Sequence, residues 1–123
     1  MIRKANPALL FCLSLFLIQA LFLVELPAQE CRKQLKVAQV ESRNKRYQQA
    51  SELYHASWPC IEANNKILFE AGLCHYTANQ IERAIRCFEQ IAHANPEYNN
   101  ELKWQLARCY HQNKNFRKAL VYY

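Results

Sequence analysis

Residues of the same type recur along most of this chain at intervals of 34 and then 35 positions. Four such series can be aligned over three copies, and each holds either small or large apolar residues. The small series are Ala38, Gly72, Ala107 and Ala50, Ala84, Ala119, and the large series are Tyr47, Ile81, Phe116 and Tyr54, Phe88, Tyr123. Because a period of this length is typical of stacked helix pairs, the pattern predicts an all-α helical-repeat array over residues 31–123.

The spacing within each copy predicts two helices joined by a short turn. Small residues allow the two helix axes to cross closely, and the large residues lie seven positions apart, on one apolar face. The repeats run over residues 31–64, 65–98 and 99–123, the third being incomplete. The polar turns 44–46, 78–80 and 113–115 contain Asn, which tolerates the left-handed conformation. Pro96 can begin the helix that follows the second copy.

On these residues the chain resembles the tetratricopeptide repeat family. The second copy fits best, with matching residues at Leu68, Gly72, Ala84, Phe88 and Pro96. His75 stands where the family usually has Tyr, and Glu41 occupies an aromatic position of the first copy. The second helix of that copy ends early, at residues 57–59. The resemblance implies antiparallel helix-turn-helix repeats stacked as a short right-handed superhelix.

In that family the first helices of successive repeats line a groove that receives a peptide or helix of a partner protein. The residues at the matching positions include the aromatic and arginine side chains that often dominate binding energies. They are Arg32, Leu35, Gln39, Arg43, Phe69, Leu73, Tyr76, Trp104, Arg108 and His111. For Phe69, Tyr76 and Trp104, packing on a neighbouring helix is the alternative interpretation. The positions of the carboxylate clamp of one subgroup hold Leu35, Gln39, Glu70, Glu101 and Gln105 here, which argues against such a clamp.

The first 28 residues have the layout of an export signal. Arg3 and Lys4 precede an apolar stretch over residues 8–24, and Ala28 provides a small residue at the expected cleavage site. The stretch is slightly shorter than the roughly 20 residues that span a bilayer. We therefore predict a cleaved signal peptide over residues 1–28 and an exported protein, periplasmic, in the cell envelope or secreted. An uncleaved membrane anchor through residues 8–24 is the alternative.

Composition narrows the function classes. The chain of 123 residues contains one Gly and no Asp, and its formal net charge is +6. The positive charges alternate with glutamates rather than forming a basic stripe, so we expect no nucleic-acid partner. No set of nucleophile, base and orienting group is evident, and Cys74-His75 and Cys109-Tyr110-His111 lack the spacing of helical metal ligands. We therefore expect no enzyme activity, no metal and no cofactor.

Five cysteines remain after the predicted signal, an odd number that leaves at least one thiol unpaired within the chain. Cys31 near the start of one helix and Cys60 just past the next should lie at the same end of an antiparallel hairpin. A disulfide between them is therefore a candidate, provided that their Cα atoms lie about 4.4–6.8 Å apart. Cys74, Cys87 and Cys109 are expected to be small buried core residues.

The sequence favours an exported repeat module that binds another protein. Two alternatives stay open. The chain could be the docking or sensor part of a longer envelope protein or enzyme whose further domain follows residue 123, as the incomplete third repeat indicates. It could also be a membrane-anchored assembly factor, if the first 28 residues are retained.

Overall fold

The chain is all-helical over the residues described by the structure, a computed structural model covering residues 4–123, with the side chains of residues 22 and 24–26 left undescribed. This confirms the predicted all-α class. The helices are α1 (Pro7–Arg43), α2 (Tyr47–Ala56), α3 (Trp58–Ile61), α4 (Asn65–Thr77), α5 (Ile81–Ala94), α6 (Asn100–Gln112) and α7 (Phe116–Tyr122). The chain divides into two units, residues 1–30 and residues 31–123.

The first unit contains the apolar segment predicted as a signal or anchor. Its described apolar side chains, from Leu9 to Leu23, are exposed, and Pro27 lies within α1. Arg3, half of the predicted basic pair, lies outside the described residues. No helix in the described part of the chain combines the length and the apolar content needed to cross a membrane.

Three turns of the second unit share one backbone geometry. After α1, the amide of Arg46 donates to the carbonyl of Glu41 and that of Lys45 to Ser42, at 2.9 and 3.0 Å. The same pair of bonds follows α4 and α6. This is the Schellman motif, which requires one left-handed residue and satisfies carbonyls at the helix end.

The residues at the left-handed position differ from our expectation. They are Lys45, Asn79 and Lys114, with φ values of 61°, 59° and 58°. The prediction that Asn holds this conformation is therefore correct only at Asn79. The hydrogen-bond pattern selects the second residue of each turn, and both lysines at this position are exposed.

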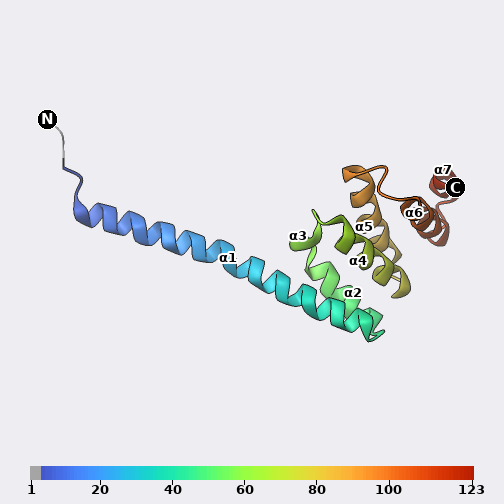
Figure 1. The fold of residues 1–123 in the computed structure, drawn as a ribbon, viewed down its shortest axis with the longest axis horizontal. Coiled ribbons are helices and arrows are strands. Elements are labelled where there is room, and N and C mark those ends of the chain that lie inside the picture. The colour runs from blue at the N-terminus through green and yellow to red at the C-terminus, as the bar shows by residue number, and fades with distance from the viewer. Residues whose placement is uncertain (1–3) are drawn as a thin grey trace. The chain divides into compact units, whose positions relative to one another are not determined.

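The small residues of the repeat lie where helices pack closely, as predicted. All six are buried: Ala38, Ala50, Gly72, Ala84, Ala107 and Ala119. A Cβ atom added at Gly72 on α4 would lie 2.6 Å from the ring of Phe88 on α5, a side chain with no exposed surface. Helices α4 and α5 lie side by side (Figure 1), and their close packing depends on the absence of a Cβ atom at Gly72.

Replacing Gly72 by Ala is expected to destabilise the array by about 1 kcal/mol. Ala gains roughly 0.5–1 kcal/mol from helix propensity, whereas overpacking a buried ring costs about 1–3 kcal/mol, so the steric term is larger. Chemical denaturation measures the difference. In a Phe88→Leu background the same substitution should cost less; an equal or greater loss there would contradict the steric explanation.

The third repeat departs from the predicted core stripe. Tyr54 and Phe88 are buried as expected, but Phe116 is 55% exposed and Tyr123 is 70% exposed. Within the described residues, no helix covers the outer face of α7 as α6 covers α5. Because apolar residues in a repeat are buried by stacking of the next unit, the predicted stripe is wrong for these two residues.

The start of the third repeat also differs from the prediction. Pro96 does not begin a helix but lies in the connection 95–99. The next helix begins at Asn100, because the side chain of Asn99 accepts a hydrogen bond from the amide of Leu102 at 2.7 Å and so acts as its N-cap.

Cys31 and Cys60 form a disulfide, with Cα atoms 6.2 Å apart. The second helix of the first repeat ends early, as predicted, and the short helix α3 brings Cys60 to the beginning of the packed part of α1. The bond therefore ties residue 31 to the end of the first helix pair. Cys74, Cys87 and Cys109 are free and buried, in agreement with their expected place in the core.

Candidate functional site

Two of the predicted groove residues, Tyr76 and Trp104, contact a third, Arg108. Its guanidinium carbon lies 4.1 Å from the ring centroid of Tyr76 on α4 and 4.4 Å from that of Trp104 on α6. Trp104 is half-exposed, and Tyr76 and Arg108 are partly buried. Trp104 and Arg108 lie four positions apart, on one face of α6, and Tyr76 belongs to the preceding repeat. We call Tyr76, Trp104 and Arg108 the Arg108 cluster.

Within the Arg108 cluster, the N–H groups of the guanidinium remain available for hydrogen bonds to a partner. The aromatic rings attract the cation through their faces, at about 0.5–1 kcal/mol per exposed contact. They accept none of its five N–H donors. The ion pairs among the described residues are Arg46 with Glu41 and Arg83 with Glu52, and neither involves Arg108.

Other predicted groove residues have different surroundings. The ring of Phe69 packs edge-on against Phe88, with centroids 5.5 Å apart, and Leu73 is half-buried against the same core. The imidazole of His111 packs edge-on against Phe116, with centroids 5.3 Å apart. Arg32 is exposed on α1. Phe69 thus contributes to packing, whereas the Arg108 cluster remains accessible.

Gln39 and Arg43 line a separate cavity of about 410 Å³. Ser42, Tyr54 and Glu70 complete its wall. Burial, reinforced by the negative charge of Glu70, raises the pKa of the Tyr54 hydroxyl, so this group stays protonated. The cavity therefore presents an arginine, a glutamate, an amide and two hydroxyl groups, a polar lining that suits a peptide backbone or polar side chain.

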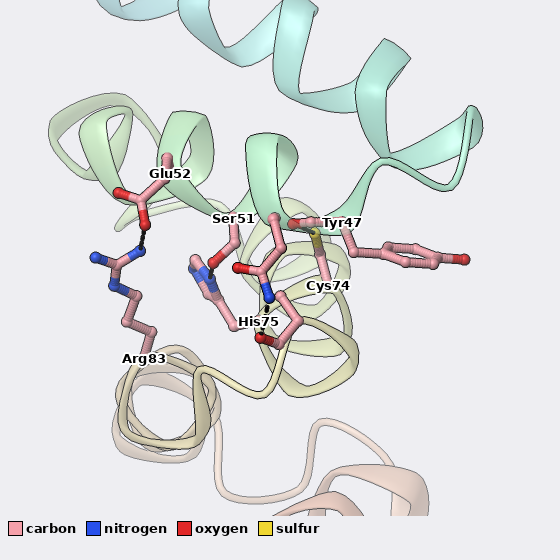
Figure 2. A network of polar contacts seen from close by, with 8 residues as sticks. Tyr47, Ser51, Glu52, Cys74, His75 and Arg83 are labelled. Atoms are coloured by element: carbon pink, nitrogen blue, oxygen red, sulfur yellow. Dashed lines mark hydrogen bonds and ion pairs between the residues drawn. The ribbon is translucent and has the colours of Figure 1, made fainter.

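A buried polar contact joins the first two repeats (Figure 2). His75 on α4 is 2% exposed, and its Nδ1 atom lies 2.7 Å from the hydroxyl of Ser51 on α2. Burial, with smaller effects of Arg83 and His55, lowers the pKa of His75 to about 4. The imidazole is therefore neutral at pH 7 and can accept the hydroxyl hydrogen of Ser51.

An ion pair at the surface lies beside this contact. Arg83 on α5 points towards Glu52 on α2 (Figure 2), and its Nη1 atom donates a hydrogen bond of 2.8 Å to Oε1 of Glu52. The hydrogen bond from Arg83 lowers the pKa of Glu52. Glu41, at the position where the family has an aromatic residue, pairs instead with Arg46, whose hydrogen bond lowers the pKa of that carboxyl. Surface ion pairs of this kind add little stability.

Three of the residues capable of chemistry, Cys74, Cys87 and Cys109, are buried thiols. Burial raises the pKa values of the Cys87 and Cys109 thiols to about 12, and it also raises that of Cys74. Because the thiolate is the nucleophile, burial makes these thiols poor nucleophiles at neutral pH. In the part of the chain that the structure describes, no group of three or more His, Cys or Glu side chains could hold a metal ion.

The sequence pointed to every member of the Arg108 cluster but not to their mutual contact. It also gave no sign of the hydrogen bond between Ser51 and His75, although the departure of His75 from the repeat pattern marked the position. No known protein family matches this chain, and no curated protein matches it.

Proposed function

We propose that this chain is an exported helical array of the tetratricopeptide type that binds another protein and has no catalytic activity of its own. The observation that carries the proposal is the Arg108 cluster, which joins two successive first helices, α4 and α6, through accessible aromatic and cationic groups. Such residues supply much of the binding energy at protein interfaces. The repeated turn geometry and the buried small residues support the repeat type.

The cavity between Gln39, Arg43 and Glu70 extends the proposed surface to the first repeat. Four of its five lining residues lie on α1 and α4, the first and second of the three helices that would line the groove, and the fifth, Tyr54, lies on α2. A partner segment that contacts both the cavity and the Arg108 cluster would therefore lie across all three repeats. This extended contact favours a peptide or a helix of a partner over a small molecule.

Changing Tyr76 and Trp104 together to Ala is expected to weaken capture of the partner at least tenfold. The measurement is crosslinking of the tagged full chain in its source cells, with quantification of the captured protein. Helical circular dichroism and thermal unfolding should change little, because both side chains are at least partly exposed.

The control is Leu120→Ala with Val121→Ala, which shortens two exposed apolar side chains on α7. It should leave capture unchanged. Equal loss in both double variants would contradict a groove site, and unfolding of the first would show that its rings are structural. The mass of the tagged chain recovered from the cells also shows whether residues 1–28 are absent, as export with cleavage requires, or retained as an anchor.

A further inference from the structure

The charge and geometry of the Arg108 cluster indicate which kind of segment the proposed groove receives. A guanidinium held against two rings loses less conformational freedom on binding than a mobile side chain does. Its contacts at 4.1 and 4.4 Å use the faces of Tyr76 and Trp104. The planar fork of N–H donors is therefore positioned and has no anionic partner among the described residues.

A carboxylate is the group that best matches the planar N–H donors of the Arg108 guanidinium. It accepts two parallel N–H bonds, and charge-assisted pairs of this kind are stronger than neutral hydrogen bonds. The nearest carboxylate in sequence on α6, Glu101, lies within 3.5 Å of the amide nitrogen of Gln105 and forms no ion pair with Arg108. The chain's net charge of +6 also attracts an acidic segment at long range.

The exposed surface of Trp104 gives the site a second requirement. This ring is 50% exposed beside the cation. An apolar or aromatic partner residue that covers this surface would remove apolar area from water, which is favourable. An acidic side chain followed closely by an apolar one would meet both parts of the cluster.

We propose that the Arg108 cluster binds an acidic segment of a partner protein, with an internal Glu or Asp side chain on the guanidinium and a neighbouring apolar side chain on Trp104. The proposal rests on the proposed protein-binding function and specifies its partner. The proposed group is a side-chain carboxylate, so an amidated peptide, which has no terminal carboxylate, is expected to bind.

The test uses two acetylated and amidated peptides, each a dozen residues long. One repeats Ser-Glu-Leu and the other repeats Ser-Gln-Leu, so they differ only in charge. Fluorescence anisotropy with the full chain should show binding of the acidic peptide at least tenfold tighter than that of the amide peptide. The preference should fall as salt is added, because screening weakens exposed charges.

Arg108→Gln should remove this preference, and Arg108→Lys should reduce it because an ammonium lacks the planar fork. The control Arg117→Gln removes one positive charge from the exposed surface of α7 and should leave the preference intact. Equal affinity for the two peptides, absence of binding to either, or an unchanged preference in Arg108→Gln would overturn the proposal. If crosslinking in cells still depends on Tyr76 and Trp104 in that case, the proposed function stands and only the acidic partner is excluded.

Discussion

Removing the disulfide between Cys31 and Cys60 by changing both residues to Ala is expected to lower the free energy of unfolding by about 3–4 kcal/mol. The bond closes a loop with a sequence separation of 29 residues, and chain-entropy theory assigns a stabilisation of this order to such a loop. The loop includes all of α2 and most of α3, so the bond restrains the whole first helix pair in the unfolded chain. Urea denaturation of the oxidised protein and of the double variant measures the difference.

The control for this experiment is the reductant. Dithiothreitol should destabilise the native sequence and leave the double variant unchanged, because the remaining cysteines are free. A double variant as stable as the oxidised protein would contradict the prediction. A nonreducing peptide map of the full chain should contain one linked pair, Cys31 with Cys60.

Acidification from pH 7 to pH 4 is expected to destabilise the array by about 3 kcal/mol through His75 alone. Its pKa is lowered from the usual 6.5 to about 4, and each pKa unit corresponds to about 1.4 kcal/mol. The unfolded chain binds a proton at this residue below pH 6.5, whereas the folded chain does so only near pH 4. The stability is therefore complete above pH 6.5 and is lost as the pH falls between these values.

The pH dependence is assigned by comparing two histidine variants. His75→Gln should lack this loss between pH 6.5 and pH 4, whatever its stability at neutral pH. His93→Gln, which changes an exposed imidazole on α5, should keep the native pH dependence. If His75→Gln loses stability as steeply as the native chain, another group controls the acid response.

The third repeat shows why pattern alone could not decide burial. Phe88 and Tyr123 stand at equivalent positions, and periodicity treats them alike. Phe88 has neighbours on both sides, including Phe69, and is fully buried, whereas Tyr123 is 70% exposed. Burial depends on the helices that surround a residue in space, which a periodic pattern does not contain.

The site was predicted in part for a similar reason. The family resemblance selected Tyr76, Trp104 and Arg108 as separate groove positions, and helical spacing placed Trp104 beside Arg108. The approach of Tyr76 to Arg108 depends on how α4 lies relative to α6. The side-chain conformations then decide whether the arginine contacts a ring, a carboxylate or solvent.

The sequence by itself determined the helical class, the positions of the turns and the small residues at the helix crossings. These features follow from local periodicity and from the space available between packed helices, both of which are encoded over a few turns of chain. Tertiary structure decided that Lys45 and Lys114 adopt the left-handed conformation, that His75 is buried against Ser51, and which groove residues meet at Arg108. Those outcomes depend on hydrogen bonds and contacts between distant segments, whose energies arise only when the helices are assembled.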